Sequence, residues 1–181
     1  MLIVNSGGAK GADSEWCKGF VDETDFHLYG FAQFRIRHPT GTTYHELSSA
    51  ELAEAMPAIR SAVASLGKQM TTSFMKLRFL QRDYHIIRGV DAVYAVGKLN
   101  PGFGGLQVDG GTGMGCQMYW NGGGRNLFFY DQDTDEWKQP NPEGVWQVLA
   151  SGPPPVSTFS KIACIGSREM TEKALEVIRS I

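Results

Sequence analysis

Short apolar runs alternate with segments of helical periodicity along most of this chain. The predicted strands are the apolar runs 2–4, 26–31, 91–96, 127–130 and 161–165. The predicted helices are the segments 13–21, 48–66, 73–88, 113–120 and 171–181. Because strands that alternate with helices form parallel sheets covered on both faces, we expect an α/β fold, a Rossmann-like three-layer sandwich with a mainly parallel sheet. The length of 181 residues indicates a single domain with this Rossmann-like fold over 1–181.

Local signals refine two of these helices. Ser48 and Glu51 form a predicted capping box at the start of the second helix, and Leu47 with Leu52 fits a hydrophobic staple. Pro57 predicts a kink or a split in the same helix, because proline removes a backbone hydrogen bond. The predicted inner face of the helix 73–88 consists of Phe74, Leu77, Leu80, Tyr84 and Ile87.

Two segments lack a clear period. Residues 32–46 are predicted to be a long loop, and long loops in compact domains are often functional. Residues 132–158 are rich in turn residues and prolines, and we expect an irregular excursion over the surface. Trp120, Trp137 and Trp146 are expected to pack in or against the core, with base stacking as the alternative.

Three glycine-rich turns lie where a predicted strand meets a predicted helix. They are the segments 6–13, 109–115 and 165–169. Glycine lets the backbone turn tightly and approach a ligand, and a helix N-terminus offers free N–H groups and partial positive charge to an anion. Because open α/β sheets bind ligands beyond the carboxyl ends of their strands, we expect Gly8, Gly111 and Ser167 to share one pocket for a phosphate-bearing molecule.

The residues predicted to bind phosphate or nucleotide come from these turns. They are Ser6, Gly7, Gly8, Lys10, Gly11, Asp13, Gly110, Gly111, Thr112, Gly113, Ser167 and Arg168. Lys10 adds charge, Thr112 offers a hydroxyl to a phosphate oxygen, and Arg168 offers a planar fork suited to phosphate. Asp13 either caps the following helix or holds a ribose hydroxyl. The alternatives are a turn without a ligand for 6–13 and a surface salt bridge for Arg168.

Arg82 and Asp109 are the candidate catalytic residues. Arg82 lies one helical turn from Arg78 among inward-facing neighbours, so it either points at the site or is a solvated charge. Asp109 is either an acid at the lip of its turn or a turn-forming residue. Gln117 is neutral and cannot act as a general base or as a carboxylate nucleophile. We place Gly111 and Arg82 at the lip of the pocket, outside the core.

Composition limits the classes of partner and site. The chain is 42% hydrophobic and 20% charged, which is ordinary for a globular protein. Its net charge of −2 argues against a nucleic-acid partner. Cys17, Cys116 and Cys164 lack metal-binding spacing and are predicted to be reduced, buried thiols of a cytoplasmic protein. The histidines form no metal set, and we expect neither a metal nor a cofactor. We expect no signal peptide and no membrane helix.

The turns at 7–13 and 166–168 carry a resemblance to a known group. Gly-Gly-Ala-Lys-Gly-Ala-Asp and Gly-Ser-Arg resemble motifs of the SLOG superfamily of Rossmann-like nucleotide-binding domains. This superfamily includes the lonely-guy phosphoribohydrolases, once misannotated as lysine decarboxylases, the molybdenum-cofactor carrier proteins and DNA-processing protein A. In many relatives the Gly-Ser-Arg turn comes first, so the resemblance implies a circular permutation of the common order in this chain.

The lonely-guy enzymes release a base from a nucleoside 5′-monophosphate. They use an Arg on the helix before the central strand and a Pro-Gly-Gly-x-Gly-Thr-x-x-Glu motif. By this resemblance Arg82 falls at the position of the Arg. The glycines of the motif are matched by Gly110, Gly111 and Gly113. Asp109, Met114 and Gln117 replace the Pro, Thr and Glu, so half of the catalytic pair is missing. Asp109 is the acid that could substitute from a different position.

We expect the chain to bind a nucleotide or a nucleotide-derived phosphate ligand. The alternative is N-glycosidase, phosphoribohydrolase or deoxyribosyltransferase activity on a nucleoside phosphate. Binding of single-stranded DNA, as in DNA-processing protein A, is least favoured because of the net charge. We also expect a homodimer, because the helices 48–66 and 73–88 carry more apolar residues than one sheet face needs. The resemblance supports this, since relatives commonly dimerise through such helices.

Overall fold

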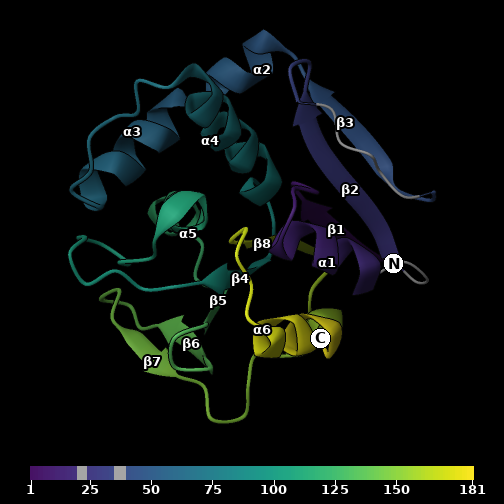
Figure 1. The fold of residues 1–181 in the computed structure, drawn as a ribbon, viewed down its shortest axis with the longest axis vertical. Helices are drawn as coiled ribbons and strands as arrows, with labels where there is room; N and C mark the ends of the chain where they lie inside the picture. Colours follow the sequence, from purple (N-terminus) through teal and green to yellow (C-terminus); the bar gives the residue numbers. More distant parts are fainter. Residues whose placement is uncertain (20–23, 35–39) are drawn as a thin grey trace.

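The computed structural model describes residues 1–19, 24–34 and 40–181, and an eight-stranded sheet forms its centre (Figure 1). The strands are β1 (Leu2–Ser6), β2 (Thr24–Phe31), β3 (Thr43–Leu47), β4 (Ala92–Gly97), β5 (Leu127–Asp131), β6 (Glu136–Pro140), β7 (Trp146–Val148) and β8 (Lys161–Gly166). Their order across the sheet is β3-β2-β1-β8-β4-β5-β6-β7. The strands from β3 to β5 in this order are parallel, whereas β6 and β7 pair antiparallel. The predicted α/β fold with a mainly parallel sheet is confirmed.

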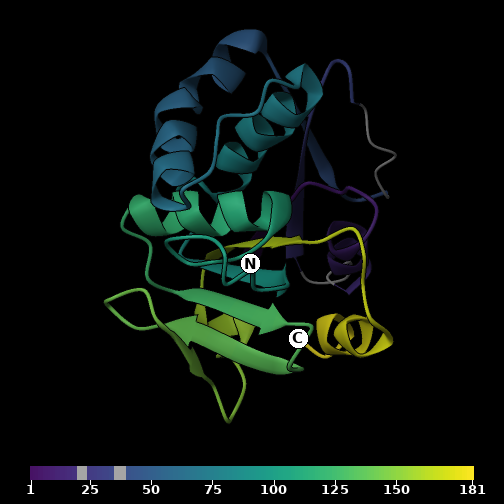
Figure 2. The ribbon, with the colours of Figure 1, turned by 60° about the vertical axis from the view of Figure 1, so that its left-hand side comes forward.

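Helices cover both faces of this sheet (Figure 2). They are α1 (Ala12–Gly19), α2 (Ser49–Glu54), α3 (Met56–Ser65), α4 (Phe74–Ile87), α5 (Gly110–Asn121) and α6 (Glu172–Arg179), with a short 3-10 helix at Val156–Thr158. α1 and α6 pack against one face through a cluster that includes Trp16 and Ile178. α4 and α5 pack on the other face. In the described ranges, no helix combines the length and the apolarity that crossing a bilayer requires.

The central strand β4 is buried along its whole length. Val93 and Ala95 contact the cluster under α5, while Tyr94 and Val96 contact the cluster under α1 and α6. Such a strand is a continuous apolar run because both faces of a parallel sheet are covered. This is why the segment 91–96 gives the clearest strand signal in the sequence.

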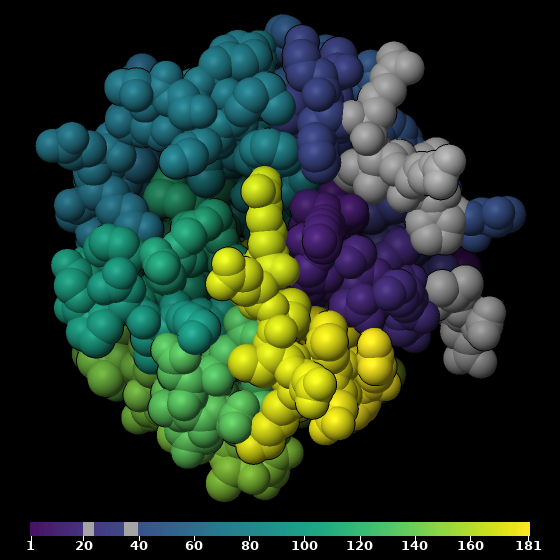
Figure 3. Space-filling view, viewed as in Figure 1, coloured from purple at the N-terminus to yellow at the C-terminus, as the bar shows by residue number. Residues whose placement is uncertain are grey.

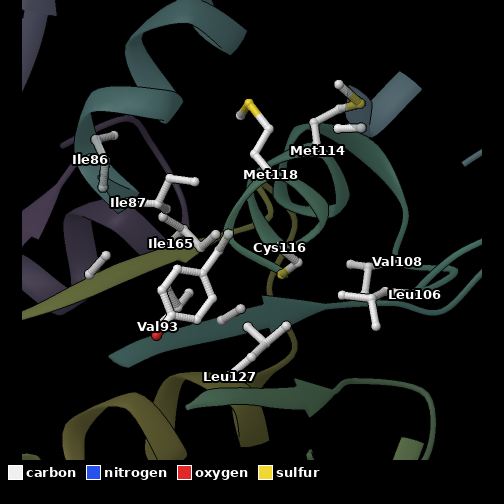
Figure 4. Packing of buried hydrophobic residues seen from close by; sticks show 14 of the residues in the cluster. Ile86, Ile87, Val93, Leu106, Val108, Met114, Cys116, Met118, Leu127 and Ile165 are labelled. Atoms are coloured by element: carbon white, nitrogen blue, oxygen red, sulfur yellow. The ribbon is translucent and has the colours of Figure 1, made fainter. Parts of the chain in front are cut away.

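The helix α5 is itself enclosed. Residues Thr112–Tyr119 are all buried, because α5 lies between the sheet and the helices α3 and α4. Cys116 points to the sheet, whereas Met114 and Met118 lie on the opposite side of the helix (Figure 4). Many of the apolar residues of α3 and α4 therefore cover α5 within the same chain.

The start of α2 and the break before α3 follow the sequence signals. Ser48 Oγ accepts the Glu51 N–H at 3.2 Å, and Glu51 Oε2 accepts the Ser48 N–H at 2.8 Å. Leu47 and Leu52 share a small buried cluster, as a staple requires. Pro57 lies in the first turn of α3. Proline is tolerated there because N–H groups of the first turn have no acceptor within the helix.

Four expectations about local structure are wrong. Residues 43–46 of the predicted loop belong to β3, and the segment 132–158 contains the paired strands β6 and β7. α5 begins at Gly110 instead of 113, because Asp109 caps it. Phe74 is 56% exposed instead of facing inward. Short strands near the edge of a sheet have weak patterns because fewer of their residues are buried. Part of the predicted loop (35–39) and the end of the predicted helix 13–21 lie outside the described residues.

A chain of polar side chains joins β2 to β3. Asp25 Oδ2 lies 2.9 Å from His27 Nε2, and His27 Nδ1 lies 3.0 Å from His45 Nε2. The ring of Tyr29 stacks on His45 with 4.8 Å between centroids. Burial lowers the pKa of His45, and the neighbouring His27 adds to this effect.

We predict that replacing His45 by Gln makes the stability of the fold less sensitive to acid. The pKa of His45 is lower in the folded than in the unfolded chain, so the unfolded chain binds more protons as the pH falls below about 6.5. The wild type should therefore lose stability between about pH 7 and about pH 5, and His45→Gln should lose less. Urea unfolding across this range measures both, and parallel curves for the two proteins would contradict the prediction.

Candidate functional site

The three glycine-rich turns lie at the carboxyl end of the parallel strands. The first follows β1 and the third follows β8, while the second opens α5 after the loop 98–108 that leaves β4. Because β8 lies between β1 and β4, the three turns are neighbours. Figure 3 shows the purple N-terminal segment in contact with the yellow C-terminal segment in the middle of one face, with teal segments beside them.

The first and third turns are joined through their backbones. The Ala12 N–H donates to the Ser167 carbonyl at 3.1 Å, and the Ser167 N–H donates to the Val96 carbonyl at 2.9 Å. Gly11 has φ +108°, and a Cβ at this position would lie 2.5 Å from the Ser167 carbonyl oxygen and 2.6 Å from the Arg168 Cα. A glycine is therefore needed where the two turns meet.

Arg82 lies beneath the first turn and is only 5% exposed. Its Nη1 donates to the Gly7 carbonyl at 3.3 Å, and its Nε and Nη2 donate to Asp83 Oδ1 at 3.1 and 2.7 Å. Nη2 also lies 3.9 Å from Asp13 Oδ2. The expected place at the lip of the pocket is thus wrong for Arg82, because it lies one turn before Ile86 on the face of α4 that packs inward. Its guanidinium supports the first turn from below.

The buried carboxyl group of Asp13 links the first turn to the third. It accepts hydrogen bonds from the backbones of Ala9 and Gly166. Burial raises the pKa of Asp13 to about 7, although Arg82 and the two backbone hydrogen bonds act in the opposite direction. Asp13 therefore links the first and third turns. The sequence pattern indicated only a helix cap or a ribose ligand for this residue.

Asp83 is a site residue that the sequence reasoning missed. Its Oδ1 accepts both hydrogen bonds from Arg82, and its Oδ2 lies 3.8 Å from the position of a Cβ on Gly111. Burial raises the pKa of Asp83, and Arg82 opposes the rise. The available signal was that Asp83 is the only carboxylate in the sequence of α4 and directly follows the inward-facing Arg82.

The start of α5 is formed by backbone groups and small side chains. Asp109 Oδ1 accepts the Gly110 N–H at 2.7 Å, and the Asp109 carbonyl accepts the Gly113 N–H at 2.9 Å. Asp109 thus has the turn-forming role that the sequence left open. The next two amides, of Gly111 and Thr112, belong to the first turn and have no acceptor within the helix. Gly111 is exposed, as predicted, whereas Thr112 is buried.

Gln117 serves the loop 98–108 instead of the turns. It is 2% exposed, its Oε1 accepts the Leu106 N–H at 2.9 Å, and its Nε2 donates to Asn121 Oδ1 at 2.8 Å. A Cβ on Gly105 would fall on the Gln117 amide, so the loop fits closely around it. The Gln117 amide therefore has a structural role, because it fixes the loop 98–108 to α5.

The remaining predicted residues divide into exposed and buried ones. Lys10 and Arg168 are exposed on the first and third turns. The guanidinium carbon of Arg168 lies 5.8 Å from the ring centre of Phe79, a neighbour of the site that the sequence reasoning also missed. Ser6 is fully buried, and in the described part of the chain its Oγ has no hydrogen-bond partner. Gly8 adopts φ +59° within the first turn.

Comparison of the chain with protein-family models, with curated proteins and with solved structures finds no match.

We predict that Arg82→Met destabilises the fold by about 3–5 kcal/mol, the usual cost of leaving a buried charge without its partner. Met keeps the apolar stem of the side chain but removes the donors to Gly7 and Asp83. Arg168→Met is the matched control, and at an exposed position it should change stability by at most about 0.5 kcal/mol. Denaturant unfolding compares the two. Equal stability of Arg82→Met and the wild type would show that Arg82 does not support the turn.

We predict that Asp13→Asn removes a pH dependence from the stability of the fold. The pKa of Asp13 is about 7 in the folded chain and 3.8 as its ordinary value, so the folded chain holds the proton more tightly. The stability from this group is complete below the unfolded pKa and is lost as the pH rises through about 7. Relative to the wild type, Asp13→Asn should therefore gain stability between about pH 4 and about pH 7. A constant difference between the two proteins in denaturant unfolding would contradict this.

Proposed function

We propose that the chain binds a nucleotide or a nucleotide-derived phosphate ligand at the carboxyl end of the sheet. The observation that carries the proposal is the convergence of the three glycine-rich turns around the buried Arg82. Gly7 of the first turn contacts Arg82, Gly11 contacts Ser167 of the third turn, and Gly111 of the second turn faces Asp83. Open α/β sheets bind ligands at this end, beside the point where the strand order reverses.

The start of α5 is where the phosphate fits best. Gly111 is exposed and has no side chain, so a ligand can approach the first-turn amides of α5. The partial positive charge of a helix N-terminus favours an anion there. Lys10 and Arg168 supply exposed cations on the two neighbouring turns. Arg82 contributes by positioning the first turn, since its donors are directed at protein acceptors.

Binding is favoured over hydrolysis because of Gln117. The amide at this position is neutral and holds the loop 98–108 through Leu106. The alternative, an N-glycosidase, phosphoribohydrolase or deoxyribosyltransferase acting on a nucleoside phosphate, has one supporting observation. Asp83 is a carboxylate that lies next to Gly111, whereas Asp109 is used as the cap of α5. Incubation with nucleoside monophosphates and detection of free base would distinguish this alternative from binding alone.

We also propose that the chain is a circularly permuted relative of the SLOG superfamily. When β8 is counted as the first strand, the six parallel strands β3-β2-β1-β8-β4-β5 read 4-3-2-1-5-6 across the sheet, and the five without the edge strand β3 read 3-2-1-4-5. This is the strand order of the Rossmann arrangement. The order supports the permutation implied by the positions of the Gly-Ser-Arg and Gly-Gly-Ala turns.

The homodimer and the cytoplasmic location stay predictions. The apolar residues that motivated a dimer are largely accounted for, because Ile59, Ala62 and Ile86 are buried in the cluster around α5. What still supports association is the exposure of Phe74 and Met75 at the start of α4.

We predict that Gly111→Asp abolishes binding of nucleoside monophosphates while the protein stays folded. A carboxylate at this position would repel the phosphate and also face Asp83. A Cβ on Gly111 would lie 3.8 Å from Asp83 Oδ2, an ordinary van der Waals distance, so the fold accommodates a side chain there. Gly111→Asn is the matched control with nearly the same shape and no charge, and it should bind more tightly than Gly111→Asp. Calorimetry measures binding, and circular dichroism checks the fold. Undiminished binding by Gly111→Asp would rule out a phosphate site at the start of α5.

A further inference from the structure

The carboxylate of Asp83 is held in a fixed orientation. One oxygen, Oδ1, accepts hydrogen bonds from both Nε and Nη2 of Arg82, at 3.1 and 2.7 Å. Arg82 is in turn held by the Gly7 carbonyl. A carboxylate has more acceptor sites than these two hydrogen bonds use, and neither of the two involves Oδ2.

The second oxygen of Asp83 faces the start of α5. Oδ2 lies 3.8 Å from the Cβ position of Gly111, and the Asp83 side chain retains 14% exposure. Gly111 is exposed and has no side chain that could cover this oxygen. A ligand at the first turn of α5 would therefore meet an acceptor beside its phosphate.

A carboxylate oxygen accepts hydrogen bonds and repels anions. It would not contact the phosphate group itself, but it would accept a hydrogen bond from a hydroxyl group on the part of the ligand next to the phosphate. In a nucleoside monophosphate that part is the sugar. The same arrangement gives no gain with inorganic phosphate, which has no sugar hydroxyl.

We propose that Asp83 Oδ2 binds a ribose hydroxyl and makes the site selective for ribonucleotides over deoxyribonucleotides. This inference rests on the proposed binding of a nucleotide phosphate at the start of α5. It assigns the sugar as the recognised group and Asp83 as the residue that determines specificity, with Arg82 as the residue that positions it.

The test compares ligands that differ only in sugar hydroxyls. Calorimetry first identifies which of the 5′-monophosphates of adenosine, guanosine, cytidine and uridine binds the wild type most tightly. The 2′-deoxy and 3′-deoxy forms of that nucleotide are then measured. We expect at least one of them to bind about 10- to 100-fold more weakly, the range for a lost hydrogen bond to a charged group. Equal affinity for all three forms would overturn the inference while leaving the proposed function standing.

Asp83→Asn assigns the selectivity to this residue. The amide side chain would keep an acceptor for Arg82 but lose the charge, and a hydrogen bond to a neutral group is weaker than one to a charged group. The variant should therefore discriminate less than the wild type between the ribonucleotide and the deoxyribonucleotides. Glu54→Gln is the matched control, because Glu54 also pairs with an arginine, Arg88 at the end of α4, at 2.9 Å, but is exposed and lies on α2. The control should retain the full selectivity. Undiminished selectivity in folded Asp83→Asn would overturn the role of Asp83.

The outcomes separate the two proposals. Absence of binding by every monophosphate would contradict both the proposed function and this inference. Binding without discrimination among sugars would contradict only the inference. The comparison of sugars in the wild type remains decisive even when Asp83→Asn does not fold, because it needs no variant.

Discussion

Burying one guanidinium at the carboxyl end of the sheet constrains everything built around it. A charge removed from water has to be paired and hydrogen-bonded, and Arg82 obtains its partners from α4 itself, from the first turn and from α1. Asp13 then extends the cluster to Gly166 and so to the third turn. The relative positions of the first and third turns thus depend on the ionic cluster of Arg82, Asp83 and Asp13.

The glycines of α5 show how packing replaces helix propensity. A glycine inside a helix costs roughly 0.5–1 kcal/mol relative to alanine, and α5 contains several. A Cβ on Gly113 would fall on the Val108 carbonyl, and one on Gly115 would lie 2.9 Å from Ile165 Cδ1. The missing side chains let the helix lie close to the sheet, where α3 and α4 enclose it. In the first turn of α5, the absence of side chains on Gly110 and Gly111 leaves the backbone exposed.

The sequence predicted most of the framework and only the outline of the site. β4 and the capping box of α2 were identifiable because burial on both faces and cap chemistry leave strong local signals. β3 was missed because, within the described residues, its five-residue segment pairs only with β2, and Leu47 is its one buried residue. The common location of the turns followed from the α/β architecture. The role of Asp83 did not, because adjacent residues on a helix ordinarily point in different directions and give no pairing signal. The link from Asp13 to Gly166 was invisible because it joins segments far apart in the sequence.

The central position of β8 in the sheet affects how the chain folds during its synthesis. β1 and β4 both pair with β8, which follows all the other strands in the sequence. Until residues 161–166 emerge, the nascent chain holds two partial sheets, each with an unpaired inner edge. Such edges are templates for pairing with other chains, and contacts between distant segments form slowly. The growing polypeptide therefore carries an aggregation hazard until β8 is available, because the two partial sheets join only through this strand.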